Sequence, residues 1–326
     1  MPRFYMMPGL GEAFFKPGAK RRNTMSGKKH KSTLKSRRAR EPWFYVGPVL
    51  IILLIMFGYP LIKSVIMAFQ NYRLGNANIY FNNFENFKEL FSDRDFPLLL
   101  KNSIVYVVVA VAGQFIGGLT LALALRDKFP GRGIYQSIVF LPWAFSTFVV
   151  GLVFRWAFNG EYGVINDLLL KLGIIDERIA WLGTPGLSLA VIIIAMIWIG
   201  IPFFGIMILA ALQSIPEDIY EAADMDGCGM FRKFFSLTLP YIKPTVIMTL
   251  LLRTIWIFNS FDLVVIVTNG GPANYSQTLP SYMYTKAFSG YDFGLAGAFG
   301  VLLMVILGVY AVLFLKLTNY DKAGDF

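Results

Sequence analysis

Cysteine and histidine are almost absent from the 326 residues: Cys228 is the only thiol and His30 the only imidazole. A single cysteine excludes an intrachain disulfide. One cysteine and one histidine are also too few ligands for a zinc site built from cysteines and histidines of this chain. We expect Cys228 to be a small packing residue and His30 to be solvated. Charged residues are also scarce, at 15% against about 25% in soluble domains. A chain this poor in charge is not expected to fold in water.

Apolar residues, in contrast, are abundant and come in long blocks. They make up 56% of the chain, and the mean hydropathy is +0.56. Several blocks reach the roughly 20 residues that a helix needs to cross about 30 Å of hydrocarbon. In lipid, such unbroken blocks satisfy their backbone only as helices, since a barrel would need short alternating strands. The sequence therefore predicts an all-α, polytopic membrane protein with six transmembrane helices, near residues 43–70, 99–125, 134–158, 187–213, 241–268 and 292–317.

The positive charge is concentrated in an N-terminal tail, residues 1–42. This segment holds 12 of the 30 lysines and arginines and only two acids, which accounts for the whole net charge of +10, so we expect no nucleic-acid partner. The tail is predicted to be disordered, and the apolar block that follows is too long for a cleavable signal. By the positive-inside rule the tail stays in the cytoplasm, where it can contact anionic lipid. Six spans then return the C-terminus to the cytoplasm.

Prolines and charges interrupt the predicted spans. The prolines are Pro48, Pro60, Pro142 and Pro202. They could bend the helices around a pathway, or they could simply be tolerated because neighbouring helices pack against them. Charges inside spans must face protein, water or headgroups, and they are Lys63, Arg155, Arg253 and Asp262. Lys63 and Arg155 are expected to snorkel. Asp262 has polar neighbours at Asn259, Ser260 and Thr268, so the fifth span is the first candidate for lining a solute path.

The stretch 214–244, a cytoplasmic loop by this topology, carries a helix-start signature. Ser214 is predicted to cap the helix and Glu217 to reciprocate, with Pro216 in the first turn. Gly227 is a natural stop, and a second short segment, 230–239, presents aromatic side chains among basic ones. Such a stiff protrusion suits docking into a groove of another protein. An amphipathic helix that rests on the membrane surface fits the pattern equally well.

The same loop contains the run Glu221-Ala222-Ala223-x-x-Asp226-Gly227, then Phe234, Leu239-Pro240 and Pro244. This run closely resembles the EAA loop of ABC importer permeases. One position departs from the family, because Cys228 stands where alanine is usual, but both residues are small. The resemblance implies that the loop is a coupling helix seated in a cleft of a cytoplasmic ATPase. The coupling residues that it implies are Glu221, Ala222, Ala223, Asp226, Gly227, Phe234, Leu239 and Pro240.

A second resemblance narrows the type of permease. The chain contains Trp256-x-Phe258-Asn259-x-Phe261-Asp262, followed by Thr268-Asn269-Gly270-Gly271-Pro272. These motifs look like those of the first permease of carbohydrate importers, of the maltose or glycerol-3-phosphate type, as do Pro142, Trp156, Gly163 and Asn166. The Gly-Gly-Pro turn also fits a plain helix end at the membrane face. The match covers roughly residues 45–320 and implies a type I ABC importer permease fold, with a transmembrane domain at 43–320, its core at about 99–317 and the coupling loop at 214–244.

The resemblance implies half of a translocation pathway in the bacterial cytoplasmic (inner) membrane. Its partners would be a second, homologous permease, a cytoplasmic ABC ATPase dimer and an extracytoplasmic solute-binding protein. Asn259, Phe261 and Asp262 would lie near the solute, where polar groups bind hydroxyls and an aromatic ring stacks on a sugar face. Helix–helix adhesion is the alternative role for such polar residues.

No Walker A loop occurs in the sequence, so ATP is expected to be bound by a partner subunit. We expect no cofactor, no metal ligands, no catalytic residues and therefore no enzyme activity in this chain. Three alternatives remain. The solute could be a polyamine, sulfate or an amino acid; the chain could be an ATP-independent secondary transporter, although no inverted repeat is visible; or it could be a membrane-embedded enzyme, although no cluster of catalytic residues occurs.

Overall fold

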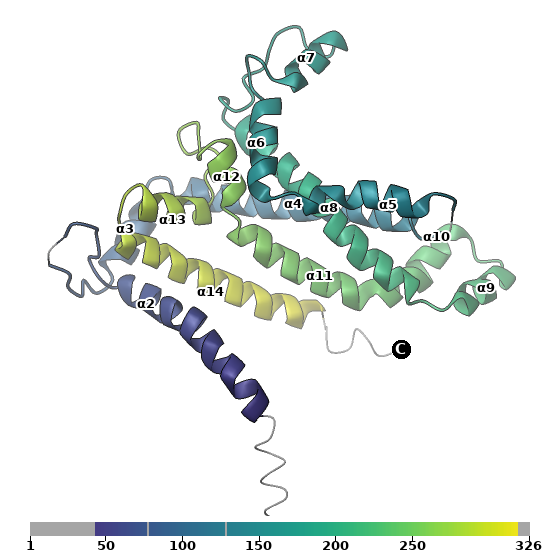
Figure 1. Ribbon diagram of the computed structural model, residues 1–326, viewed down its shortest axis with the longest axis horizontal. Helices are drawn as coiled ribbons and strands as arrows, with labels where there is room; N and C mark the ends of the chain where they lie inside the picture. Colours follow the sequence, from purple (N-terminus) through teal and green to yellow (C-terminus); the bar gives the residue numbers. More distant parts are fainter. Residues whose placement is uncertain (1–42, 77, 128, 319–326) are drawn as a thin grey trace, which may run out of the picture. The chain divides into compact units, whose positions relative to one another are not determined.

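The computed structural model describes residues 43–76, 78–127 and 129–318, which fold into helices joined by turns (Figure 1). No strand longer than an isolated β-bridge occurs among these residues, so the all-α prediction is confirmed for them. The chain divides into two compact units, Met1–Tyr59 and Pro60–Phe326. In the first unit the described residues, 43–59, are helical. The tail predicted to be disordered, residues 1–42, lies outside the described residues.

Five helices in the described part of the chain are long and apolar enough to cross a membrane. They are Trp43–Met67, which includes η1 (Leu54–Gly58) and α2 (Tyr59–Met67), then α4 (Phe96–Ala124), α8 (Leu187–Gln213), Met230–Asn259 and α14 (Phe293–Thr318). Four of these lie within a few residues of predicted spans. The third and fifth predicted spans differ from the structure, each for a local physical reason.

The third predicted span, 134–158, is not one straight helix. It consists of α5 (Arg132–Phe140), a 3-10 turn η2 (Leu141–Ala144) and α6 (Thr147–Ala157), with a bend of 91°. Phe145 and Ser146 have extended backbones, and the Ser146 side chain caps α6 by accepting a hydrogen bond from the Phe148 N–H (3.2 Å). A side-chain cap of this kind starts a new helix. The number of spans is therefore six only if this bent pair counts as one.

The fifth predicted span, 241–268, begins earlier and ends earlier. α10 (Met230–Lys233), a π-turn η3 (Phe234–Thr238) and α11 (Leu239–Asn259) form one continuous helix. The π-turn ends two residues before Pro240, whose missing N–H and bulky ring disturb regular α-helical bonding to the preceding turn. The helix stops at Ser260, which has an extended backbone (φ −75°, ψ 112°), and α12 (Asp262–Val267) starts afresh. The polar residues 259–262 therefore lie at a helix break.

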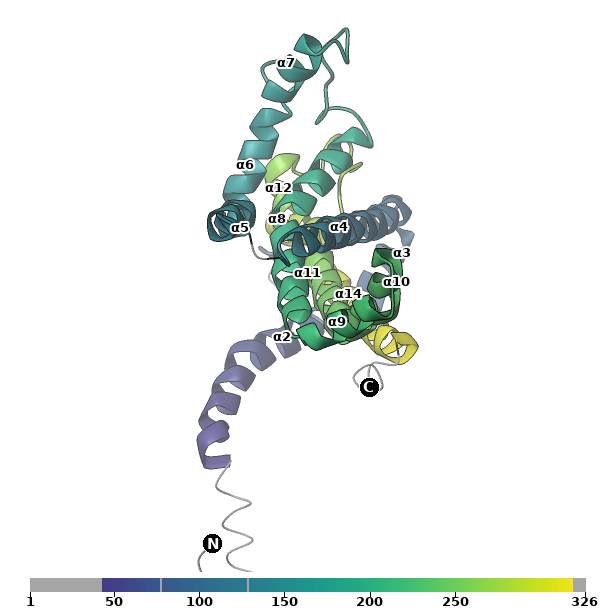
Figure 2. The ribbon, with the colours of Figure 1, turned by 90° about the vertical axis from the view of Figure 1, so that its right-hand side faces the viewer.

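The second unit is held together by close packing of α4 against α8 (Figures 1 and 2). α8 is the most deeply buried of the long helices. Where the two helices meet, a Cβ added at Gly118 would lie 2.3 Å from the Cβ of Phe204, and one added at Gly117 would lie 2.9 Å from the Ile201 side chain. Small residues that let backbones approach are the main device for helix association in lipid.

The segment between α12 and α14, including α13 (Leu279–Phe288), is fixed to the start of α4 by polar contacts. Asn102 donates hydrogen bonds to the carbonyls of Tyr275 and Gln277, at 3.0 and 2.9 Å. The Tyr282 hydroxyl donates to Asp93 (2.7 Å), which follows the short helix α3 (Glu85–Ser92). Burial, reinforced by this hydrogen bond, raises the pKa of the Tyr282 phenol. These contacts hold residues 93–102 and residues 275–282 together, although the two segments are far apart in the sequence.

Gly270 and Asn166 have structural roles that explain their presence. Gly270 has φ +83°, and a Cβ there would lie 2.3 Å from the Gln277 side chain. The turn therefore also packs closely against the Gln277 side chain, in addition to ending α12. Asn166, fully buried on α7 (Val164–Lys171), donates to the carbonyls of Gly160 and Ile179 (3.0 Å each) and accepts from the Trp181 indole (2.8 Å).

Replacement of Gly118 by alanine tests the α4–α8 contact. The added methyl group has no room beside Phe204, so we expect Gly118→Ala to lower the free energy of unfolding by about 1–3 kcal/mol, the usual cost of overpacking. Gly133→Ala is the matched control, because Gly133 is also helical but has open space around it. Thermal unfolding in detergent measures both variants. Equal midpoints for the two variants would show that α4 and α8 do not need this close approach.

Candidate coupling loop and solute cavity

The loop between α8 and α11 begins differently from the sequence prediction. Ser214 has helical backbone angles (φ −81°, ψ −10°), and its hydroxyl donates backward to the Ala211 carbonyl (2.8 Å). It therefore closes α8 instead of capping the next helix. Pro216, with an extended backbone, occupies the N-cap position of α9 (Glu217–Met225), which has no side-chain cap. The predicted capping box of Ser214 and Glu217 is wrong, because the serine belongs to the preceding helix.

The end of α9 agrees with the sequence prediction. Gly227 has φ +69°, and its N–H donates to the Asp224 carbonyl (3.0 Å) while the Cys228 N–H donates to the Ala223 carbonyl (2.9 Å). This pair of bonds is the Schellman motif, in which glycine takes the left-handed position without a Cβ penalty. Cys228 is half-buried in the turn.

α9 is attached to the rest of the protein through one side. The Tyr220 hydroxyl shares a hydrogen bond with Thr238 (2.9 Å), and the Arg126 guanidinium lies 3.8 Å from the centre of the Tyr220 ring. Lys233 on α10 forms an ion pair with Asp224. A hollow of about 680 Å³ lies at this junction, and its lining includes Phe231, Phe234 and Phe235.

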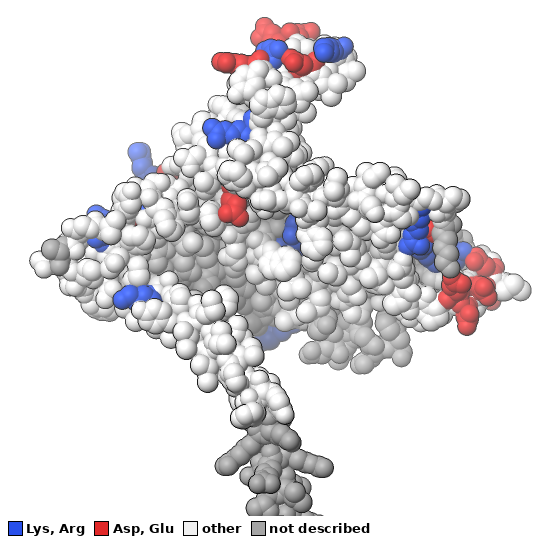
Figure 3. Space-filling model, viewed as in Figure 1, with Lys and Arg blue, Asp and Glu red and all other residues white. Residues whose placement is uncertain are grey.

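The predicted coupling residues divide into two groups. Phe234, Leu239 and Pro240 are half-buried at the base of the loop, and Ala223 is buried where α9 meets the protein. The other four are exposed, and they are Glu221, Ala222, Asp226 and Gly227. Acidic side chains gather over α9 (Figure 3), and large apolar side chains at the tip are also exposed: Met225, Met230 and Phe231. The loop thus exposes an acidic helix and an apolar tip.

The residues predicted to line the solute path lie around the break after α11. Asn259 is exposed, and its amide donates to the Ile255 carbonyl (3.0 Å). Asp262 is exposed at the first position of α12. Phe261 is stacked on Tyr284, with ring centres 4.7 Å apart, and lines an apolar hollow of about 540 Å³. The two polar residues are therefore free to meet solvent or solute, whereas Phe261 packs on a neighbouring ring.

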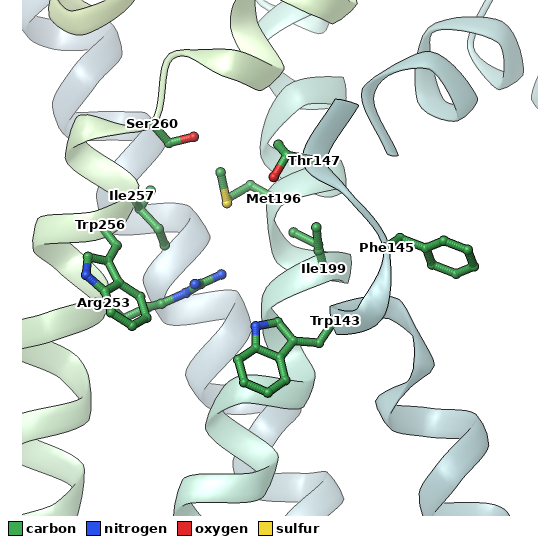
Figure 4. A pocket seen from close by; sticks show the side chains of 9 residues that line it. All are labelled: Trp143, Phe145, Thr147, Met196, Ile199, Arg253, Trp256, Ile257 and Ser260. Atoms are coloured by element: carbon green, nitrogen blue, oxygen red, sulfur yellow. The ribbon is translucent and has the colours of Figure 1, made fainter. Parts of the chain in front are cut away.

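A second cavity, of about 230 Å³, lies on the other side of this break, between α8, α11 and the bend that precedes α6 (Figure 4). Ser260 is the only residue of the 259–262 segment in its lining. The complete lining is Trp143, Phe145, Thr147, Met196, Ile199, Arg253, Trp256, Ile257 and Ser260. The Phe145 ring points away from the cavity, and the Arg253 side chain extends from α11 into it (Figure 4).

Arg253 is only 8% exposed. Its Nε donates to Gln114 Oε1 (2.6 Å), and Gln114 Nε2 donates to the Met196 carbonyl (2.6 Å). This chain of hydrogen bonds joins α11, α4 and α8. The sequence identified Arg253 as a charge inside a span but assigned it no role, and only the bend at η2 brings Trp143 to the same cavity.

The comparisons with known proteins agree with this architecture. The family model described as "Binding-protein-dependent transport system inner membrane component" matches residues 114–319. The chain is 34% identical over 273 residues to the sulfoquinovosyl glycerol transport system permease protein SmoG of Agrobacterium fabrum, covering 83% of this chain and 88% of that protein. It is 32% identical over 291 residues to the trehalose/maltose transport system permease protein MalF of Thermococcus litoralis, covering 89% and 98%.

Among solved structures, the chain is similar to one from a bacterial ABC transporter involved in the import of the acidic polysaccharide alginate. The TM-score is 0.76 at 25% sequence identity, and the similarity covers 89% of this chain and 99% of that one. The family resemblance and the permease fold inferred from the motifs are therefore confirmed. The chain belongs to the family of binding-protein-dependent transport system inner membrane components and is a multi-pass protein of the inner membrane.

Proposed function

We propose that this chain is the permease subunit of an ATP-driven importer of sugars or sugar-like solutes and forms half of its translocation pathway. The observation that carries the proposal is the exposed α9 helix with its Glu-Ala-Ala and Asp-Gly residues, on a protein of this transport family. The sugar class is supported by relatives named for transport of trehalose/maltose and sulfoquinovosyl glycerol, and by a structural relative from an alginate importer.

The loop is proposed to dock into a separate cytoplasmic ATPase. Four of the nine residues of α9 are acidic: Glu217, Asp218, Glu221 and Asp224. Helices that lie on membranes are typically basic on their polar face, so this composition favours a protein partner over an anionic lipid surface. The chain itself is proposed to bind no ATP and to carry no enzyme activity, because hydrolysis would belong to the ATPase dimer.

The structure gives the loop a direct mechanical connection to the membrane helices. α10, η3 and α11 form one helix from Met230 to Asn259, so a displacement of the loop is carried along α11 to the break at Ser260. The ion pair between Lys233 and Asp224 and the Tyr220–Thr238 hydrogen bond tie α9 to that same helix. Closure of an ATPase dimer would therefore move α9 and α11 together.

The orientation and the partners complete the proposal. The loop and the end of α14 lie toward the same end of the second unit (Figures 1 and 2), which supports a cytoplasmic C-terminus if the loop meets an ATPase. The basic tail would place the N-terminus there as well. A second, homologous permease would supply the other half of the pathway, and a solute-binding protein would deliver the solute from outside. The transmembrane domain would extend over 43–320.

Substitutions in the loop test the coupling role. Gly227→Pro is incompatible with φ +69°, because proline is restricted to φ near −65°, and Glu221→Ala removes an exposed charge of the motif. We expect both variants, purified in mild detergent, to retain the second permease but lose the ATPase subunit, with at least a tenfold fall in solute-stimulated ATP hydrolysis. Glu161→Ala, an exposed acid outside the loop and the spans, is the control and should behave as wild type. Full retention of the ATPase by Gly227→Pro would contradict the coupling role.

Substitutions at the helix break test the solute path. We expect Asn259→Ala and Asp262→Asn to raise the solute concentration for half-maximal uptake about two- to twelvefold in the complete importer, the range expected for loss of one hydrogen bond of about 0.5–1.5 kcal/mol. The maximal rate should change little. Glu161→Gln, an exposed acid outside the spans, is the control. An unchanged half-saturation in both variants would remove these residues from the path and leave them as helix-end residues.

A further inference from the structure

Arg253 is a buried cation with no counter-ion among the described residues. The side chain is 92% buried, and its one hydrogen bond within the described residues is to the neutral amide of Gln114. The ion pairs of the described part of the chain involve other residues, and none of them includes Arg253. A buried charge without a counter-ion is costly, and charges inside spans usually face a partner or a water-filled path. We therefore expect the counter-charge to come from a group other than the described residues.

The orientation of Arg253 is set by the packing of α4 against α8. Gln114 is held between the helices, because a Cβ added at Gly200 would lie 2.0 Å from its Cδ atom. Because the Gln114 Nε2 donates its hydrogen bond to the Met196 carbonyl, the Gln114 Oε1 faces Arg253 and accepts a hydrogen bond from its Nε. The two terminal nitrogens of the guanidinium carry four further N–H donors, and none of these has a hydrogen-bond acceptor among the described residues. They extend into the cavity (Figure 4).

Two hydroxyl groups lie near this charge. Ser260 lines the cavity, and the Tyr106 hydroxyl is buried close to Ser260 without a hydrogen bond of good geometry. An unsatisfied buried hydroxyl is unusual in a folded protein and calls for a partner. Of these two hydroxyls only that of Ser260 lines the cavity, so the polar groups on this side of the cavity are the Ser260 hydroxyl and the charged Arg253 guanidinium.

The apolar side of the cavity is formed by aromatic rings. Trp143 and Trp256 line the cavity, and each is about half exposed, at 50% and 51%. Phe203 joins them, with ring centres 6.0 Å from Trp143 and 5.4 Å from Trp256, and the Arg253 guanidinium carbon lies 5.4 Å from the Phe203 ring centre. Exposed aromatic rings offer flat apolar surface to a sugar face. At about 230 Å³, the cavity has room for one sugar unit.

We propose that Arg253 binds the carboxylate or sulfonate group of an acidic sugar unit, while Trp143 and Trp256 contact its ring. This inference rests on the proposed importer function and adds the charge class of the solute. A guanidinium is suited to this role because its planar fork offers two parallel N–H donors to an oxyanion and does not lose its charge. The neutral Gln114 on the opposite edge holds the fork in place and leaves the positive charge for the solute.

The test is a binding titration on the permease–ATPase complex without its solute-binding protein, so that the permease cavity decides the preference. The ligands are digalacturonate, the matching neutral galactose disaccharide and sulfate. Binding of each ligand is measured by the quenching of tryptophan fluorescence. We expect digalacturonate to bind at least tenfold more tightly than the other two. Equal binding of the two disaccharides would overturn the proposal, and sulfate binding as tight as that of digalacturonate would overturn its sugar part.

Variants assign the preference to Arg253. Arg253→Gln should reduce the preference for digalacturonate to less than twofold while leaving the affinity for the neutral disaccharide unchanged. Arg253→Lys keeps the charge without the fork and should retain part of the preference, which a purely structural role for Arg253 would not predict. Arg155→Gln is the matched control, because Arg155 is also in a span helix but lines a different hollow. If the Arg253→Gln complex does not assemble, the test uses Arg253→Lys instead. A complete loss of the preference for digalacturonate in Arg253→Lys would then count against the proposal.

Uptake into proteoliposomes separates this inference from the importer function. With the binding protein and ATP present, ATP-driven uptake of a neutral sugar without any preference for acidic ones would refute the role of Arg253 and leave the proposed function intact. Absence of ATP-driven uptake for sugars of either charge would refute the proposed function itself.

Discussion

The close approach of α4 and α8 is the constraint on which the second unit depends, because lipid provides no hydrophobic force to hold two apolar helices together. Gly118 allows the α8 backbone at Phe204 to approach so near that a single added Cβ would collide with it. At the same contact, Gln114 is pressed against Gly200 and bonded to a carbonyl of α8, which turns its free oxygen toward Arg253. One packing contact therefore also positions the charged group of the cavity.

The continuity of α10, η3 and α11 connects the two candidate sites through one helix. The loop is tied to the base of this helix by Tyr220 and Lys233, and the cavity receives Arg253 and Trp256 from the same helix farther along. The break at Ser260 ends that connection. A helix transmits displacement along its axis because its hydrogen bonds resist bending, whereas an extended residue can act as a joint. A movement that begins at the loop would consequently reach the cavity before the segment beyond the break.

Local signals in the sequence were sufficient where one residue or one block decides the structure by itself. Long apolar blocks predicted α4, α8 and α14 to within a few residues, and Gly227 ended α9 because a left-handed turn needs no Cβ. The same reasoning failed where two local signals compete. Ser214 is a good N-cap in isolation, but its hydroxyl bonds to the helix before it. The apolar block 134–158 is present as a bent pair of helices, and the bend lies at the turn that contains Pro142 and before the Ser146 cap, in agreement with the bent-helix explanation of the prolines.

The sequence by itself determined that this protein is a helical membrane protein and predicted its docking loop, because hydrophobic length, helix signals and the loop motif are properties of contiguous residues. Only the tertiary structure decided which polar groups share a cavity. Trp143 and Arg253 lie on segments far apart in the chain, and they line one cavity because a 91° bend brings η2 toward α8. Gln114, on a third segment, holds Arg253 because glycines let α4 and α8 touch. The physical reason is that a sequence pattern records which face of one helix is apolar, but the charge and shape of a cavity depend on the side chains that several helices contribute together.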